Sequence, residues 1–484
     1  MQTEPAIAPP PALSQQEIRK IVIGVLAAML LAALDQNIVA PAIPDIRAAL
    51  RDDVYFPWLV SGYFLTATAV TPLYGKLSDI YGRRPALFAG IGIFILGSII
   101  CALAPSMGVL IAGRCVQGIG GGGLIALAQT VIGDIVPPRE RAGYVAYITG
   151  VWAMASIAGP ILGGGLAHYA HWSLIFWINL PIAAAALWLT NASLKKLPRL
   201  RRDHALDYLG SALVMAATVA LLLALTWGGS RYPWGSEPVL ALLAASLVLT
   251  ALFGWRLLAA AEPLIPLDVI RNPVVAKAVA ALFFAMGSYV AIATYLPLYF
   301  QSVFGLDAGQ SGLAMVVVLV ATVAGANTTG RYMPRVKHYK RMALAGCALA
   351  AAATALLALR ARQAGFAEAL LLTGLAGLGV GPVFPITTVA VQNAVDPRDL
   401  GAATSAAAFL RSLGSTIGVA VLGATLLAYG IGGQETGAGA QAQAGFGTAF
   451  FAAAAAFCLC FAFLLAMEEL PLRGRVPAMQ RRAD

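Results

Sequence analysis

Charged residues are scarce in this sequence. Lysine, arginine, aspartate and glutamate together make up 11% of its 484 residues, whereas 60% are hydrophobic. A soluble protein carries about 25% charged residues, so the composition excludes an ordinary soluble enzyme and indicates a chain that crosses a membrane many times. The net charge of +10 predicts no nucleic-acid partner, because the basic residues follow the loops on one side of the membrane.

Cysteine and histidine are also few. The five cysteines lie within or beside apolar segments, where thiols usually pack as small apolar residues. His168 and His171 could share a metal ion, but we favour an ordinary loop at the membrane surface. The sequence contains no G-x-S-x-G, H-E-x-x-H or Walker motif. We therefore expect no metal, no cofactor and no ATP-driven step, and a membrane-embedded enzyme is an unfavoured alternative.

Long apolar runs fill most of the chain. A helix needs about 20 mainly apolar residues to span a bilayer, and on that rule we count fourteen spans. They are about 21–43, 56–76, 85–104, 107–131, 143–166, 172–192, 207–227, 238–260, 274–300, 309–330, 341–360, 366–393, 401–428 and 446–467. Lysine and arginine gather on the side of the N-terminus, which the positive-inside rule assigns to the cytoplasm. We expect both termini there.

An internal repeat divides the chain into two halves. A glycine and a basic residue close both the second span, in TPLYGKLSDIYGRR (71–84), and the tenth, in NTTGRYMPRVKHYKR (327–341). The same number of residues separates three pairs of glycines: Gly75 and Gly330, Gly159 and Gly414, and Gly163 and Gly418. Parallel repeats of six helices are common in secondary transporters.

The repeat predicts an all-α membrane protein with two six-helix bundles. The seventh and eighth spans match neither half, so we expect them to be two extra helices inserted between the bundles. The predicted parts are a cytoplasmic tail at 1–20, a bundle at 21–192, a linker with the extra helices at 193–272, a second bundle at 273–468 and a tail at 469–484.

One acid, Asp35, lies near the middle of the first span. A charged carboxylate at the bilayer centre costs about 2.5–3.5 kcal/mol even on a lenient scale, so its side chain must face protein or a watery cavity. It is the only acid that we place deep in a span, and Ser288 stands opposite it in the second half. We expect Asp35 to couple transport to protons; an acid buried for structural reasons is the alternative.

Two arginines are also expected inside spans. An unpaired buried cation is costly, so Arg114 needs a partner, and Asp35 is the candidate, directly or through Gln117 or water. We expect protonation of Asp35 to loosen this contact and let the halves rock; a purely structural arginine is the alternative. Arg411 either pairs with carbonyls at a helix end or faces the cavity and repels cations.

The string GKLSDIYGRR lies between the second and third spans. Gly75 and Gly82 would permit a tight turn, because glycine reaches positive φ freely. Asp79 would cap or neutralise the positive end of the third span, while Arg83 and Arg84 supply basic charge. A generic basic turn explains these charges but not the whole string.

This string resembles the signature loop of the major facilitator superfamily. The fifth span resembles the antiporter signature of drug exporters through five residues, Gly150, Gly159, Pro160, Gly163 and Gly164. That resemblance implies a helix that seals one conformation against proton leak. LDQNIVAPAIP, GRCVQGIGGGG, DYLG, PLIPLDVIRNP and FLRSLGSTIGVA are similar to further motifs of this superfamily, most of them typical of its fourteen-helix drug–proton antiporters. The resemblance covers nearly the whole chain after residue 18.

Two departures accompany the resemblance. Ala40 and Pro41 stand where the family often has Asn-Val, and the tenth and thirteenth spans lack the acid that some relatives use for polyvalent cations. Dicationic substrates are therefore not implied.

The resemblance implies an exporter of lipophilic or cationic drugs, driven by proton exchange, in a bacterial cytoplasmic membrane. We expect the protein to be a monomer. Its partners would be small substrates, protons and the lipid bilayer. Aromatic side chains offer apolar and cation–π contacts, although in membranes they also serve as packing. The candidate substrate contacts are Asn37, Tyr63, Gln117, Trp152, Phe284, Tyr289, Asn327 and Arg411. Export of a lipid, a siderophore or a self-made antibiotic is the alternative.

Overall fold

The computed structural model describes six stretches of the chain, residues 14–51, 55–56, 58–194, 206–229, 231–431 and 440–472. Their regular structure is helical apart from a single β-bridge between Gly228 and Tyr232. Thirteen helical stretches of these residues are long and apolar enough to cross a membrane. A further helix of 24 residues, α2 (Trp58–Tyr81), is more polar but packs among them. With it, the described residues contain the fourteen helices that the apolar runs predict.

The first bundle contains six helices, one of them broken. They are α1 (Gln15–Leu50), α2, α3 (Arg83–Ala102), α4 (Met107–Ile135), α5 (Pro138–Tyr169) and the broken pair α6 (Leu174–Trp177) and α7 (Asn179–Leu194). Glycines bring α4 against its neighbours. A Cβ on Gly120 would lie 2.3 Å from the Phe94 nitrogen, and one on Gly122 would lie 2.1 Å from the Ala67 oxygen. Only glycine allows these backbones to approach so closely.

The two extra helices, α8 (Tyr208–Trp227) and α9 (Glu237–Ala259), pack on each other, and α8 also contacts α2. Arg256 of α9 pairs with the buried Asp207 at 3.0 Å, and Asp207 also accepts the Gly210 N–H at the start of α8. Most of α9 is exposed although it is strongly apolar, as expected of a helix that faces lipid.

The second bundle repeats the six-helix arrangement after the short helix α10 (Leu267–Arg271). Its elements are α11 (Pro273–Phe304), α12 (Ala308–Tyr332), η1 (Met333–Arg335), α13 (Lys340–Arg360), α14 (Phe366–Val380), α15 (Val383–Ala394), η2 (Pro397–Asp399), α16 (Leu400–Ala428) and α17 (Ala440–Ala466). The broken pair α14 and α15 takes the place of one span, because the chain breaks at Gly381 and Pro382.

The repeated glycines make corresponding contacts in the two bundles. A Cβ on Gly163 of α5 would lie 2.0 Å from the Ile38 oxygen of α1. A Cβ on Gly418 of α16 would lie 2.2 Å from the Gly287 oxygen of α11. The fixed spacing in the sequence therefore marks the same close helix packing in each bundle.

Helix ends differ from several predictions. The first span does not end near residue 43: α1 passes through Pro41 and Pro44 and ends at Leu50, followed by the C-cap residue Arg51, whose φ is 51°. Neighbouring helices and local adjustments of the backbone make proline tolerable inside membrane helices. The predicted tight turn at Gly75 is wrong, because α2 continues to Tyr81 and only Gly82, with φ of 96°, makes the turn.

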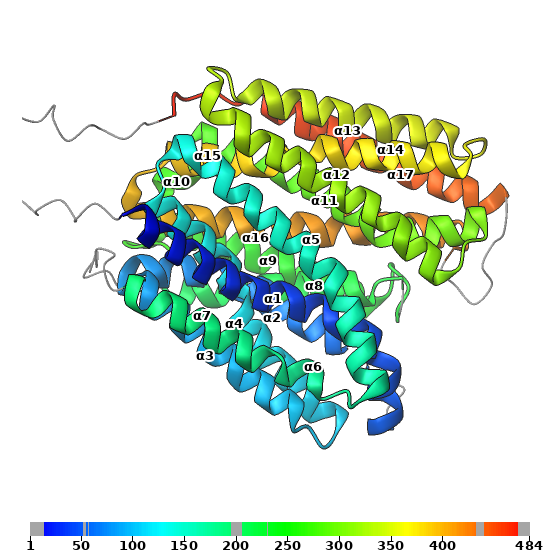
Figure 1. Ribbon diagram of the computed structural model, residues 1–484, viewed down its shortest axis with the longest axis horizontal. Helices are drawn as coiled ribbons and strands as arrows, with labels where there is room; N and C mark the ends of the chain where they lie inside the picture. The colour runs from blue at the N-terminus through cyan, green and yellow to red at the C-terminus, as the bar shows by residue number, and fades with distance from the viewer. Residues whose placement is uncertain are drawn as a thin grey trace, which may run out of the picture.

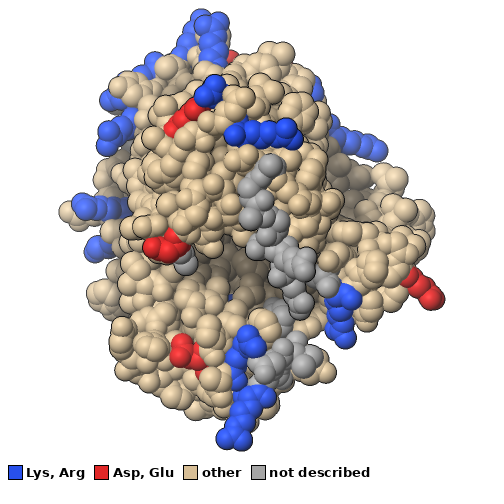
Figure 2. Space-filling view, turned by 90° about the vertical axis from the view of Figure 1, so that its right-hand side faces the viewer, with Lys and Arg blue, Asp and Glu red and all other residues tan. Residues whose placement is uncertain are grey.

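The bundles lie side by side, with the first at the bottom and the second at the top of Figure 1. The described ends of the chain lie together at the left of that view, at what we call the closed end. Figure 2 shows the opposite face, which is hollowed between the bundles and which we call the hollowed face.

Candidate functional site

Asp35 and Arg114 form an ion pair inside the first bundle. Their exposed fractions are 0% and 1%, and Arg114 Nη1 donates to Asp35 Oδ2. Arg114 Nε donates to the Leu59 oxygen at 2.9 Å, and its guanidinium lies 4.5 Å from the centre of the Tyr63 ring. The structure thus places the two predicted charges in direct contact. Each compensates the other, and removing either would leave a buried charge without its counterion.

Two amide side chains complete the surroundings of the carboxylate. Asp35 Oδ1 accepts from Gln117 Nε2 at 3.1 Å and from Asn179 Nδ2 at 3.0 Å. Gln117 Oε1 also accepts from Arg114 Nη1 at 2.8 Å, so this glutamine touches both charges. Asn179 is the first residue of α7, and the break after α6 places its side chain there.

Ser98 of α3 joins these residues. We call the whole group, which comprises Asp35, Tyr63, Ser98, Arg114, Gln117 and Asn179, the polar cluster. The Ser98 hydroxyl accepts from Gln117 Nε2 at 2.8 Å and from Asn179 Nδ2 at 3.3 Å, and donates to the Phe94 oxygen. Asn179 Oδ1 is buried and has no partner among the described residues. The sequence alone does not point to Ser98 or Asn179, because polar residues inside apolar runs are too frequent to single these two out.

Asp79 lies at the closed end, between the bundles. Its carboxylate accepts the backbone N–H groups of Gly401 at 3.2 Å and Ala402 at 2.8 Å, in the first turn of α16. It also pairs with Arg83, whose Nε bonds Asp134 Oδ2 at 2.7 Å. The prediction that Asp79 caps the third span is wrong, because the free N–H groups it binds belong to α16 of the other bundle. We call this contact of α2 with α16 the first seam.

A second seam joins α5 to α12 at the same end. A Cβ on Gly330 would lie 2.8 Å from Gly143 Cα, and Arg139 Nε donates to the Pro334 oxygen at 2.9 Å. The counterpart of Gly330 in the repeat is Gly75. It lies in the first seam, where a Cβ on Gly75 would lie 1.8 Å from Ser405 Oγ. Both repeated glycines therefore let one bundle approach the other.

The other signature residues lie within the first bundle. Arg84 Nη2 donates to Asn191 Oδ1 at 2.6 Å and so ties α3 to α7. α5 continues through Pro160 without ending, and a Cβ on Gly159 would lie 2.6 Å from Asn37 Cβ of α1. These contacts fix α5 closely against α1.

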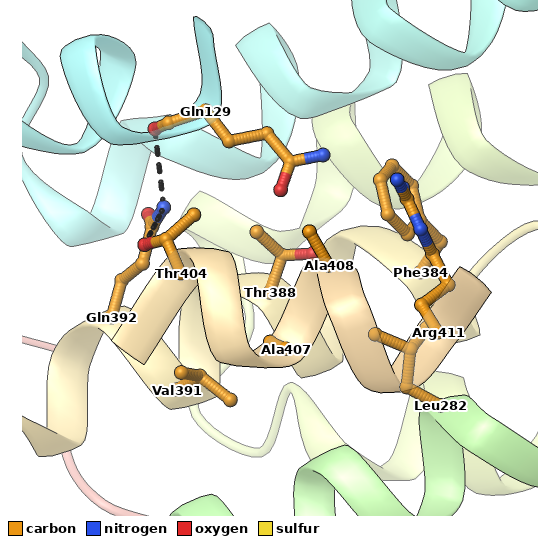
Figure 3. Close-up of a pocket in the computed structure, with 10 residues that line it drawn as sticks. All are labelled: Gln129, Leu282, Phe384, Thr388, Val391, Gln392, Thr404, Ala407, Ala408 and Arg411. Atoms are coloured by element: carbon orange, nitrogen blue, oxygen red, sulfur yellow. Dashed lines mark hydrogen bonds between the residues drawn. The ribbon is translucent and has the colours of Figure 1, made fainter. Parts of the chain in front are cut away.

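A small cavity lies between the bundles, with about 240 Å³ of empty volume including its opening. It is lined by residues of α4, α11, α15 and α16, which are Gln129, Leu282, Phe384, Thr388, Val391, Gln392, Thr404, Ala407, Ala408 and Arg411 (Figure 3). Of the eight predicted substrate contacts, Arg411 belongs to this lining. The glutamines and threonines of this lining were not among the predicted contacts, because nothing in one sequence tells which faces of four distant helices meet.

The remaining predicted contacts lie elsewhere. Tyr63 and Gln117 belong to the polar cluster, and Asn37 Nδ2 donates to the Ala33 oxygen of its own helix at 2.7 Å. Phe284 stacks on Phe463 with ring centres 5.8 Å apart. Trp152, Tyr289 and Asn327 are partly buried and lie outside the lining of the cavity. Their role in binding stays a prediction.

The two histidines that could share a metal have separate partners. His171 Nδ1 lies 2.8 Å from Ser173 Oγ, whereas His168 lies 3.9 Å from an Asp45 carboxylate oxygen. In the part of the chain that the structure describes, no group of three potential ligands gathers around one point.

Comparison with known proteins decides the family. The family model of the Major Facilitator Superfamily matches residues 25–419. The chain belongs to this superfamily. "Efflux pump dotC" of Dothistroma septosporum (strain NZE10 / CBS 128990) is 34% identical over 406 residues, which cover 82% of this chain and 70% of that protein. "Multidrug resistance protein 3" of Bacillus subtilis (strain 168) is 31% identical over 409 residues, covering 84% and 80%.

Solved structures of other major facilitators share the fold. The crystal structure of the human organic anion transporter MFSD10 matches with a TM-score of 0.65 at 17% identity, covering 92% of this chain and 99% of that one. This major facilitator is therefore a multi-pass membrane transporter with efflux pumps among its relatives, and it belongs to a family of transporters rather than enzymes.

Proposed function

We propose that this major facilitator exports lipophilic compounds, cationic drugs among them, in exchange for protons, with Asp35 as the proton-coupling carboxylate. The observation that carries the proposal is the polar cluster. A fully buried acid is held by one guanidinium and two amides inside a single bundle. A carboxylate so placed can change its charge only by gaining or losing a proton.

Protonation would disturb the first bundle strongly. Neutralising Asp35 leaves the buried charge of Arg114 uncompensated, and breaking a buried pair from one side costs about 3–5 kcal/mol. The protonated cluster would therefore favour a different arrangement of α1, α4 and α7, the helices that carry Asp35, Arg114 and Asn179.

A series of contacts between neighbouring helices connects the polar cluster to the closed end. α1 carries Asp35 and packs on α5 through Gly159 and Gly163. α5 in turn forms the second seam with α12 through Gly143 and Gly330. We infer that a shift of α1 on protonation loosens this seam, so that the closed end opens as the hollowed face closes.

We further propose that both termini lie in the cytoplasm of a bacterial cell, that the hollowed face is external and that the protein works as a monomer. Asp35 would then take up a proton outside and release it inside. When one net charge moves inward per cycle, as in the exchange of a neutral substrate for one proton, a potential of 100 mV supplies about 2.3 kcal/mol, which corresponds to roughly fiftyfold accumulation of substrate. We also propose that residues 21–192 and residues 273–468, the two ranges predicted from the repeat, are the two moving bundles.

The test is ethidium-induced proton release from acid-loaded inside-out vesicles. We expect release with the wild type and with Asp45→Asn, a matched control on the same helix outside the polar cluster, and none with Asp35→Asn. Release by Asp35→Asn at the wild-type rate would move the proton site elsewhere. Silence from all three folded proteins would favour a lipid, a siderophore or another specific cargo over drugs.

A further inference from the structure

The cavity beside Arg411 receives side chains from both bundles. Gln129 comes from α4 of the first bundle, whereas Phe384 and Gln392 come from α15 and Arg411 from α16 of the second (Figure 3). The bundles meet at its edge, where Gln392 Nε2 donates to the Gln129 backbone oxygen at 3.2 Å. A ligand in this cavity would touch both moving parts of the transporter.

Arg411 has no counterion in the described chain. Its guanidinium lies 5.2 Å from the centre of the Phe384 ring, and no acid among the described residues lies within ion-pair distance of it. Arg114, the other arginine that the sequence predicts deep inside a span, pairs with Asp35. Arginine does not shed its proton in proteins, so the cavity carries a full positive charge that the described residues leave uncompensated.

A second hydrogen-bond donor faces the same space. Gln129 is 3% exposed, and its Nε2 is buried without a partner among the described residues. Figure 3 shows its amide reaching along the cavity toward the side where Arg411 and Phe384 lie. A planar guanidinium and an amide N–H that face one space are suited to a carboxylate, which accepts several charge-assisted hydrogen bonds at once.

We propose that this cavity is an anion subsite, which binds the carboxylate of a lipophilic organic acid between Arg411 and Gln129. The proposal rests on the export function above and adds lipophilic organic acids to the substrates proposed there. The cavity is small, so it takes the carboxylate, and Phe384 and Leu282 in its wall offer apolar contact to the part of the molecule next to that group. A cation at the same place would meet the charge of Arg411 with no acid to offset it.

The subsite also changes the charge balance of transport. Exchange of a monovalent cation for one proton moves no net charge, whereas exchange of a monovalent anion for one proton moves two. Export of the acid would therefore respond to an inside-negative membrane potential as well as to the pH gradient.

The test measures binding with three probes that share one apolar body: pyrenebutyrate, pyrenebutanol and pyrenebutyl-trimethylammonium. The full chain is placed in phosphatidylcholine nanodiscs and titrated by fluorescence, with empty nanodiscs as the blank. We expect the wild type to bind the carboxylate about tenfold tighter than the alcohol, from hydrogen bonds to a charged group. Arg411→Gln should abolish that ratio, and the exposed Arg362→Gln should keep it.

A second variant, Gln129→Glu, tests the subsite independently in case Arg411→Gln does not fold. The new carboxylate would neutralise Arg411 from within the cavity, so the preference for pyrenebutyrate should again disappear. Equal binding of all three probes by the wild type, or an unchanged preference in either folded variant, would overturn the subsite. Because binding is measured without a gradient, these results do not depend on proton exchange, and a failure of the vesicle assay would leave them standing.

Discussion

The two bundles share their packing but differ in what they bury. In the first, Asp35, Arg114, Gln117 and Asn179 form a charged cluster in the interior. In the second, Ser288 stands opposite Asp35 in the repeat, and its hydroxyl only donates to the Ala453 backbone oxygen at 2.9 Å. The fold therefore does not need the charges: the same helix arrangement forms around a serine, and the cluster is an addition to one half.

Away from the cavity beside Arg411, the second bundle buries a cluster of aromatic rings. Around Tyr299, rings of three helices pack edge to face or tilted, with Phe446 and Phe450 both 5.1 Å from it between ring centres. Such contacts depend little on pH. We infer that the second bundle serves as the rigid partner against which the first responds to protons.

The largest effect is expected from breaking the ion pair. Arg114→Gln should destabilise the protein by about 3–5 kcal/mol, because Asp35 is left as a buried charge. The double variant Arg114→Gln with Asp35→Asn should recover part of this loss, since no buried charge of the pair then remains. Thermal unfolding in detergent measures both. Ser288→Ala in the second bundle, which removes one hydrogen bond worth about 1 kcal/mol, is the matched control; an equal loss there would contradict the asymmetry.

The next effect concerns the glycines of the two seams. Gly75→Leu should oppose closure more than Gly330→Leu, because a Cβ would lie 2.5 Å from the Gly401 backbone oxygen in the first seam and 2.8 Å from Gly143 Cα in the second. Overpacking of this kind costs about 1–3 kcal/mol. Electron–electron distances between spin labels at Tyr81 and Arg398 report the fraction of open molecules, because these exposed positions follow Asp79 by two residues and precede Gly401 by three, on the two sides of the first seam. A larger shift with Gly330→Leu would reverse the predicted order.

A smaller difference is expected between the polar contacts of the seams. Asp79→Ala removes the acceptor for two N–H groups of α16, and loss of a helix cap costs about 0.5–2 kcal/mol. Arg139→Gln removes a hydrogen bond exposed to water and should change the equilibrium much less. The same spin labels measure both variants. If the two variants shift the distances equally, the carboxylate of Asp79 stabilises the closed state no more than the exposed hydrogen bond of Arg139 does.

The smallest effect is expected at the Tyr299 hydroxyl, which is buried without a partner among the described residues. Tyr299→Phe should leave the melting temperature unchanged or raise it slightly, because no hydrogen bond is lost. Ser98→Ala in the first bundle should lower it, since Gln117 and Asn179 would lose an acceptor at an expected cost of about 1–3 kcal/mol. A drop caused by Tyr299→Phe would mean that its hydroxyl does have a partner.

Much of the fold could be predicted from the sequence. The lengths of the apolar runs predicted fourteen helices, and the glycine spacing predicted two similar bundles. Asp35 and Arg114 also stood out, because a charge inside an apolar run is costly wherever the helix packs and so demands a partner. These features depend on local composition and on periodic spacing, which one sequence displays directly.

Only the tertiary structure decided which distant groups meet. Asp79 looked like a cap for the helix that follows it, but it binds α16, more than 300 residues away in the chain. Asn179 reaches Asp35 because the chain breaks between α6 and α7, and Gln129 faces the same cavity as Arg411 because α4 and α16 cross there. A sequence states which groups need partners. The choice among partners is made by helix packing, since free N–H groups, amides and charges bind whatever the closest-fitting arrangement of helices brings within reach.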